Sequence, residues 1–149
     1  MAKMAVPLQR TASTSASLGS ITADATRPRR CRLYDFVLGS EASPADNAFL
    51  YRGSRCTAAG TSTSVTPRNL DPADATTEFD AGQNHTVEPT YTSNSSLFLI
   101  ALNQRSTFRW VAAPGSELVI PATASNGIGI ETPTASAVTI SAMLYIDEA

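Results

Sequence analysis

The segment 137–147 constrains the fold most, because its apolar side chains recur at every second position. The recurring residues are Val138, Ile140, Ala142, Leu144 and Ile146. A period of two is the pattern of a β-strand with one buried face, since successive side chains of a strand point to opposite faces. The last part of the chain is therefore predicted to be a strand that covers a core.

Upstream of this segment, short strand candidates alternate with turns. Residues 97–102 are apolar at every position, which indicates a strand covered on both faces or buried at a subunit contact. Residues 107–111 contain aromatic and β-branched side chains on either side of Arg109, and such side chains favour strands. Pro114 with Gly115, and Asn126 with Gly127, are turn signals, because Gly and Asn tolerate positive φ.

The middle of the chain holds further strand candidates. Residues 31–38 are rich in β-forming side chains, so we interpret them as the first core strand. The other candidates are residues 48–57, 60–66, 76–79, 88–92, 117–120 and 128–130. About eight strands at this spacing are typical of a sandwich or barrel, and 149 residues are enough for one domain to bury a core. We therefore expect a single all-β domain.

The first 26 residues have a different composition, low in large apolar side chains and dense in Ser, Thr and Ala. Such a composition is typical of a segment that does not fold by itself. We therefore predict a flexible or extended N-terminal arm over residues 1–30 and a β-sandwich domain over residues 31–149. The arm would become ordered on a neighbouring subunit or a lattice, where new contacts offset the cost of ordering.

Two kinds of targeting segment were compared with these residues. No continuous apolar stretch follows Lys3, so a secretory signal is not predicted. A transit peptide is the alternative to an arm, because the segment is rich in Ser, contains Arg10 and has Asp24 as its acidic residue.

Charge is sparse along the chain. Charged residues make up 16% of it, against about 25% in typical soluble domains, and small neutral residues suit packing against other protein. The net charge of −2 gives no global attraction to nucleic acid or to an anionic membrane, so neither is expected as a partner. The one basic cluster is Arg27, Arg29, Arg30 and Arg32. We interpret it as part of the arm, facing solvent or an interface, rather than as a nucleic-acid site.

No set of residues indicates catalysis, a metal or a cofactor. His85 is the only histidine and is expected in a loop. A zinc site would lack further ligands, and a hydrolytic triad would depend on this single base without a nucleophile motif. We therefore expect a protein that is not an enzyme.

Cysteine and acidic residues have ordinary structural interpretations. Cys31 and Cys56 lie at strand candidates and are interpreted as two buried thiols, with a disulfide as the alternative. The acidic group comprises Asp71, Asp74, Glu78 and Asp80. It lacks the residue order of a calcium loop, so turn capping is favoured, with Asp71 bonding the amides that follow it.

Four stretches of the sequence are distinctive, namely VTPRNLDPAD at 65–74, NHTVEPTY at 84–91, LNQRSTFRWVAAPG at 102–115 and IPATASNGI at 120–128. They resemble small virion structural proteins of tailed bacteriophages and prophages, with head decoration (cement) proteins as the nearest functional analogy. The resemblance implies a jelly-roll-like antiparallel β-sandwich that forms a homo-oligomer, a trimer, on the outer surface of the capsid. It implies the major capsid protein as a partner, and it brings no catalytic residue.

The partner-binding residues that follow from this hypothesis lie in two places. Arg27, Arg29 and Arg30 belong to the arm that would grip the shell, and Leu97 and Leu99 belong to the apolar stretch that would line the subunit contact. A decoration protein acts by adding interface between neighbouring capsomers, which raises the cost of separating them. Removal of residues 1–26 would then release the protein from particles without unfolding it.

Two other functions are compatible with the sequence. The first is a tail or fibre component that binds a glycan or receptor, with Trp110 and Tyr91 exposed in a shallow groove. Against this, a tryptophan in a strand is more often a core residue. The second is a small hydrolase of capsular polysaccharide, which would need an acid pair that the sequence does not mark. The fold class does not choose among them, because sandwiches host many functions.

Overall fold

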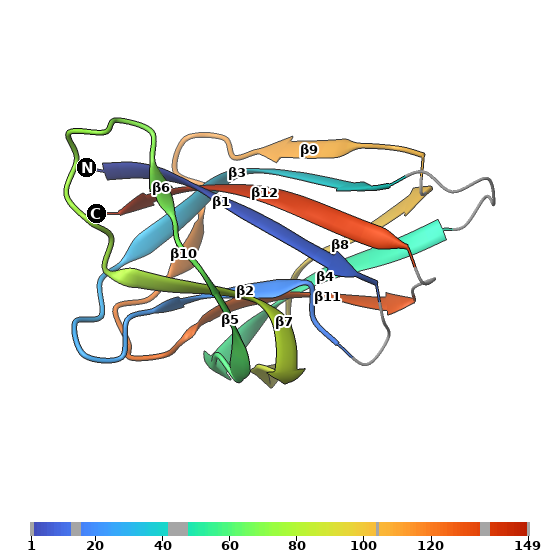
Figure 1. Ribbon diagram of the computed structural model, residues 1–149, viewed down its shortest axis with the longest axis horizontal. Coiled ribbons are helices and arrows are strands. Elements are labelled where there is room, and N and C mark those ends of the chain that lie inside the picture. Colours follow the sequence, from blue (N-terminus) through green and yellow to red (C-terminus); the bar gives the residue numbers. More distant parts are fainter. Residues whose placement is uncertain (1, 13–15, 42–47, 104, 135–137, 149) are drawn as a thin grey trace.

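The computed structural model describes residues 2–12, 16–41, 48–103, 105–134 and 138–148. Within these ranges the chain forms twelve β-strands and no helix. The strands form two six-stranded antiparallel sheets that pack face to face as a sandwich (Figure 1). The expected all-β sandwich is therefore confirmed, whereas its jelly-roll connectivity stays an expectation.

The first sheet has the strand order β10-β3-β12-β1-β6, and β9 joins β3 on the side that β10 also uses. Its strands are β1 (Ala2–Thr11), β3 (Cys31–Ser40), β6 (Arg68–Asn69), β9 (Phe108–Val111), β10 (Leu118–Ile120) and β12 (Thr139–Glu148). β1 and β12 pair along their whole length, with Ala2 opposite Glu148 and Thr11 opposite Thr139. The first and last strands therefore lie side by side (Figure 1).

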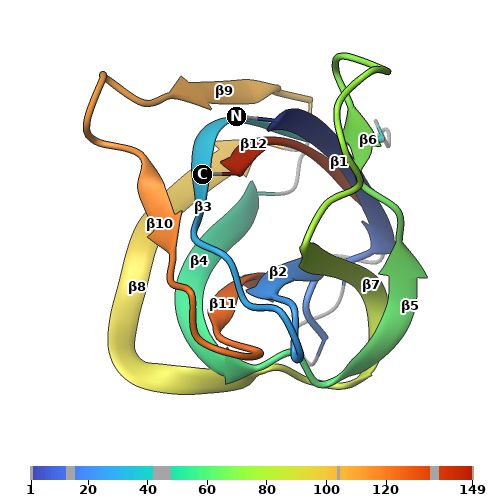
Figure 2. The ribbon, with the colours of Figure 1, turned by 90° about the vertical axis from the view of Figure 1, so that its left-hand side faces the viewer.

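The second sheet has the strand order β5-β7-β2-β11-β4-β8. Its strands are β2 (Gly19–Ala23), β4 (Ala48–Ala58), β5 (Thr61–Val65), β7 (Phe79–Val87), β8 (Thr90–Asn103) and β11 (Gly127–Thr134). β2 lies inside the sheet, paired with β7 on one side and with β11 on the other. β8 lies at the outer margin, beyond β4 (Figure 2).

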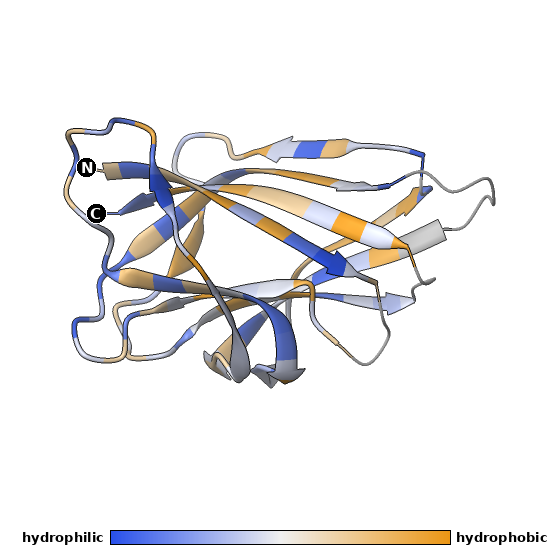
Figure 3. Cartoon of the chain, viewed as in Figure 1, coloured by the Kyte–Doolittle hydropathy of each residue, from blue (hydrophilic) through white to orange (hydrophobic). Residues whose placement is uncertain are grey.

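The core lies where the period-two pattern predicts it. On β12 the alternate residues Ile140, Ala142, Leu144 and Ile146 are buried. Figure 3 shows more and less hydrophobic residues alternating along this strand. Residue 137, the predicted start of the strand, lies outside the described residues.

An aromatic cluster joins the two sheets. The ring of Phe36 on β3 is 1% exposed and stacks on Phe98 of β8 at 4.9 Å and on Trp110 of β9 at 5.2 Å between centroids. Phe108 lies at 6.3 Å from the same ring. Trp110 is half-buried and packs on the core, as the sequence predicts.

The N-terminal segment is the main correction to the sequence analysis. An arm is predicted over residues 1–30, yet this region contributes β1 to the first sheet and β2 to the second. On β1, Met4, Val6 and Leu8 are buried at alternate positions, just as on β12. Every residue of β2 is buried, and the strand lies inside the second sheet between β7 and β11. One domain therefore covers the described residues from 2 to 148, and the division at residue 30 is wrong.

His85 is a second correction, because it lies in β7 rather than in a loop and is 3% exposed. Its Nε2 atom lies 3.0 Å from the hydroxyl of Ser20 on β2. The strand predicted over residues 76–79 is also wrong, since only Phe79 belongs to a strand, β7. The polar residues of β7 conceal its pattern in the sequence.

Several local predictions are confirmed. Cys31 and Cys56 are buried free thiols, and burial raises their pKa values to about 12 and about 11. The Asp71 carboxylate accepts a hydrogen bond of 2.9 Å from the amide of Ala73. Gly115 takes the positive φ expected of its turn, 84°. At the second predicted turn, Ser125 takes the positive φ instead of Asn126 or Gly127.

Candidate interaction surface

β8 is the longest strand in the described part of the chain and forms one edge of the second sheet. Its 14 residues include no charged side chain and no proline. β4 pairs with one side of the strand. No described strand pairs with its other side. The remaining groups on that side are therefore open to a further strand.

The other sheet margins differ from β8 in ways that limit strand addition. β5, at the opposite margin of the same sheet, has 5 residues, and β6 has 2. The margin beside β3 is divided between β9 and β10, which have 4 and 3 residues and are separated by the turn at Gly115. Short edge strands are a common way in which proteins avoid unwanted pairing. In the described structure, β8 is the long edge without such protection.

The inner face of β8 is anchored to the core. Phe98 lies over Gly53 of β4, where any Cβ atom would clash with the phenylalanine ring. This bare backbone lets the ring reach Phe36 of the other sheet. Leu97, Ile100 and Leu102 also pack against the core while remaining half-buried. The strand is therefore held in place from one face, which leaves its edge and its outer face accessible.

The outer face of β8 presents an apolar residue beside a neutralised ion pair. Leu99 is 61% exposed and lies opposite Arg52 in the pairing with β4. The Arg52 guanidinium bonds the Glu131 carboxylate at 2.7 Å. Because these two charges pair with each other, the surroundings of Leu99 carry little net charge.

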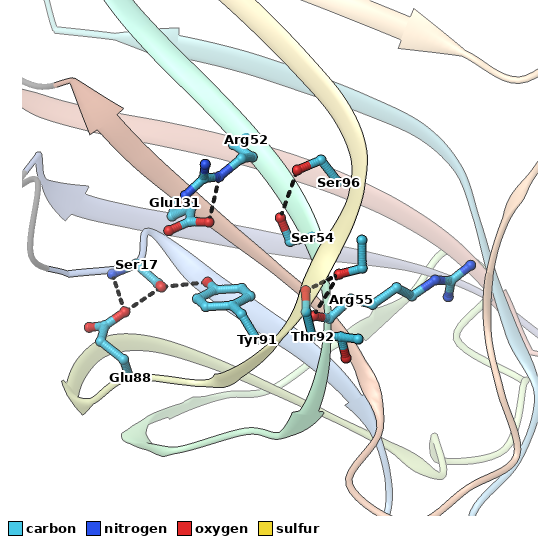
Figure 4. A network of polar contacts seen from close by, with 10 residues as sticks. Ser17, Arg52, Ser54, Arg55, Glu88, Tyr91, Thr92, Ser96 and Glu131 are labelled. Atoms are coloured by element: carbon cyan, nitrogen blue, oxygen red, sulfur yellow. Dashed lines mark hydrogen bonds and ion pairs between the residues drawn. The ribbon is translucent and has the colours of Figure 1, made fainter.

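The first half of β8 is polar and bends. Asn94 has a positive φ of 55°, and the register with β4 shifts in this region. The Ser95 hydroxyl donates to the Thr92 carbonyl at 2.6 Å, and the Ser96 hydroxyl lies 3.4 Å from that of Ser54 (Figure 4). The register with β4 is regular only from Phe98 to Asn103, because it shifts once more between Phe98 and Ser96.

The start of β8 is fixed by a partly buried hydrogen-bond network (Figure 4). The Tyr91 hydroxyl lies 2.6 Å from the Ser17 hydroxyl, and Ser17 donates its amide and its hydroxyl to the Glu88 carboxylate. The Tyr91 ring lies against Gly129, where a Cβ atom would approach the ring carbons within 2.9 Å. Burial raises the pKa of Tyr91, so the phenol stays neutral. The network holds the β7–β8 connection to the segment that precedes β2.

Two hollows accompany these strands. One of about 290 Å³ lies on the outer face of the second sheet, between the Arg52–Glu131 pair, Tyr91 and the serines of β8. A larger one of about 720 Å³ lies on the first sheet, where Pro7, Val37 and Met143 are flanked by polar residues such as Arg68. Their hydroxyl and apolar groups suit contacts with another protein.

Other chemistry has little support among the residues that the structure describes. They include no cluster of three His, Cys, Asp or Glu side chains able to hold a metal ion. Ser20 and His85 form a hydrogen-bonded pair, but each is only 3% exposed, so a substrate could not reach them. No described helix is both long and apolar enough to span a membrane.

The structure does not bring the predicted partner-binding residues together. Arg27, Arg29 and Arg30 lie in the connection between β2 and β3, and all three are exposed. Arg27 pairs with Glu78 at 3.0 Å. Leu97 is half-buried on β8, and Leu99 projects from the same strand.

The predicted stretch 97–102 is a strand, but its environment differs from one of the two expectations. Within the chain it is not covered on both faces, since Leu99 and Ala101 are exposed. The subunit contact stays a proposal. What sequence reasoning missed is the edge position, and the signal that could have indicated it is the absence of charge from residue 90 to residue 103.

No protein-family model, no curated protein and no solved structure matches this chain. The geometry above and the resemblance of the four stretches are therefore the basis for its function.

Proposed function

We propose that this chain is a structural protein of a tailed-phage virion, which decorates the outer surface of the head and stabilises the shell by bridging capsomers. Its partners would be the major capsid protein and further copies of itself, with a trimer implied by the resemblance. The observation that carries the proposal is the uncharged edge of β8 with the exposed Leu99. A rigid domain with such an edge is suited to binding other protein rather than to remaining alone in solution.

The way in which the protein would bind the shell differs from the arm hypothesis. Because β1 and β2 belong to the two sheets, these two strands are not free to grip a lattice. Arg29 and Arg30 stay candidates for a second contact, since both are exposed on the β2–β3 connection. β8 and this connection would then contact different partners, because they lie on separate elements.

The four stretches that carry the resemblance fall largely on connections and short edge strands. They include the turn between β7 and β8, the end of β8 with β9, and the connection from β10 to β11. Connections and edges are where proteins of one fold commonly contact their partners. This placement supports an assembly role for the resemblance rather than a core-packing one.

The glycan-binding alternative has no comparable support. Trp110 lies on β9 of the first sheet and Tyr91 on β8 of the second, so the structure does not place them in one groove. Trp110 stacks on Phe36, and Tyr91 is held against Ser17. Neither ring forms an open stacking platform.

The test is binding to phage heads that lack the protein. We expect the wild-type chain to co-sediment with such heads and to appear as regular knobs on the lattice by cryo-electron microscopy. Leu99→Lys should reduce binding, because a charge would have to be buried at the contact. Val111→Lys is the matched control, since Val111 is 58% exposed on the other sheet. Density on the tail, or no binding by the wild-type chain, would contradict the proposal.

A further inference from the structure

We infer that the occupant of the free β8 edge is β8 of a second copy, paired antiparallel about a two-fold axis at Leu99. The second sheets of two copies would then form one continuous sheet. The inference rests on the proposed function and deepens it by naming the partner at this edge. Three features of β8 support this pairing, namely its unpaired backbone edge, its lack of charge and the exposed Leu99.

The edge calls for a strand because its unused groups are backbone amides and carbonyls. Outside the bend at Asn94, residues 95–103 of β8 continue without a positive φ. A partner strand satisfies such a row of groups, whereas side chains satisfy them only one by one. The half-buried Phe98 and Ile100 on the inner face would gain cover from the same partner.

The absence of charge indicates that this strand is another β8. In a two-fold contact each residue meets the same surface on its partner, so any charged residue near the axis lies close to its own copy. Like charges opposite each other destabilise a sheet. β8 has none over 14 residues, and Arg52, which lies opposite Leu99 on β4, is already paired with Glu131. Two copies of β8 can therefore pair without bringing like charges together.

The position of Leu99 sets the register. It lies in the segment Phe98 to Asn103, which pairs with β4 in a regular register, and it is 61% exposed. A two-fold axis there places Leu99 against its copy and Phe98 against Ile100 of the second copy. The most exposed large hydrophobic residue of the described structure thereby becomes covered.

The contact is limited to two copies at this edge. Pairing uses the β8 edge of both copies, and the opposite margin of each sheet is the five-residue β5. A two-fold contact with such short outer edges gives a defined pair instead of a fibre. A trimer formed through another face would be linked to neighbouring trimers by this contact.

Cysteine cross-linking of the full chain tests the inference. We expect Leu99→Cys to form a covalent dimer under mild oxidation or with a short bis-maleimide. The two native thiols should not interfere, because both are buried with raised pKa values. Val87→Cys and Val111→Cys are matched controls, since each valine is 58% exposed away from β8. We expect neither control to cross-link.

Sedimentation gives the second readout. The wild-type chain should sediment as a dimer, or as a multiple of one, and Leu99→Lys should weaken self-association roughly tenfold or more. Circular dichroism should show the same fold for both. A wild-type monomer, or equal cross-linking of the control variants, would overturn the inference. Dimers that do not bind heads would contradict the proposed function alone, and heads that bind monomers would contradict the inference alone.

Discussion

β2 and β8 show opposite relations between composition and position in the same sheet. β2 is made of Gly, Ser, Ile, Thr and Ala, yet it lies inside the sheet with every residue buried. β8 contains the apolar run 97–102, yet it lies at the margin with Leu99 61% exposed. Burial in this fold therefore depends on the position of a strand in its sheet rather than on the hydrophobicity of the strand. An apolar run left at a margin then indicates a function.

Close packing explains why β2 has small residues. A Cβ atom added to Gly19 would lie 2.7 Å from the Leu8 side chain and 2.8 Å from the Gly82 carbonyl oxygen. The buried hydroxyl of Ser20 has a hydrogen-bond partner, because it lies 3.0 Å from the Nε2 atom of His85. Large side chains would not fit at these positions.

Removal of residues 2–23 is expected to have the largest effect, because it takes a paired strand out of each sheet. The truncated chain should show no cooperative thermal unfolding by circular dichroism. Replacement of Arg29 and Arg30 by Ser is the control, since both side chains are exposed and should be dispensable for folding. A truncated chain that melts like the wild type would show that β2 is not part of the core.

Gly19→Ala is expected to cost about 1–3 kcal/mol of unfolding free energy, because the new methyl group meets backbone as well as side chain. Gly39→Ala is the matched control. There the nearest atom to an added Cβ is the Thr107 hydroxyl at 3.6 Å, which is ordinary contact. Urea denaturation of both variants measures the difference. Equal stability of the two variants would mean that β2 at Gly19 is packed no more tightly than the end of β3 at Gly39.

The smallest effect is expected from pH, through the contact of β2 with His85. Burial lowers the pKa of His85 below its ordinary value of 6.5, with Glu88 raising it and Arg10 lowering it as lesser influences. The unfolded chain therefore binds a proton more readily than the folded one. Stability should be fully present above pH 6.5 and decline as the pH falls through the lower pKa of the folded state, by about 1.4 kcal/mol per unit of separation.

Denaturation curves between pH 7 and pH 5 measure this slope. His85 is the only histidine of the chain, so replacing it tests whether it causes the slope in this range. His85→Gln should flatten the curve while keeping a hydrogen-bonding side chain next to Ser20. An unchanged slope in this variant would assign the proton uptake to another group.

Strong local patterns made part of the fold predictable. The alternation on β12, the β-forming residues of β3 and the turn at Gly115 all depend on neighbours in the sequence, and the structure agrees with them. β1 and β2 are missed by the sequence interpretation, because the Ser, Thr and Ala residues around them dominate the composition of this region. Their stability comes from partners far away in the chain, namely β12 for β1 and β7 with β11 for β2.

The candidate site was predictable in content but not in position. The apolar run that includes Leu97 and Leu99 is evident in the sequence. A strand covered on both faces and an edge strand at a contact produce the same run, however, so the pattern alone does not separate them. Strand order decides, and strand order depends on pairing between segments that are distant in sequence.

The pairing of β1 with β12 also has a consequence for synthesis. Thr11, the last residue of β1, lies opposite Thr139, the first of β12. At ordinary translation rates the ribosome needs on the order of ten seconds to make the chain between them. During that interval β1 has left the ribosome without the strand that pairs along its whole length, and β8 has already emerged. The apolar edge of the nascent chain would thus be exposed to pairing with other chains during synthesis. Chaperones, or the slow emergence of neighbouring nascent chains, would be needed to keep it from pairing too early.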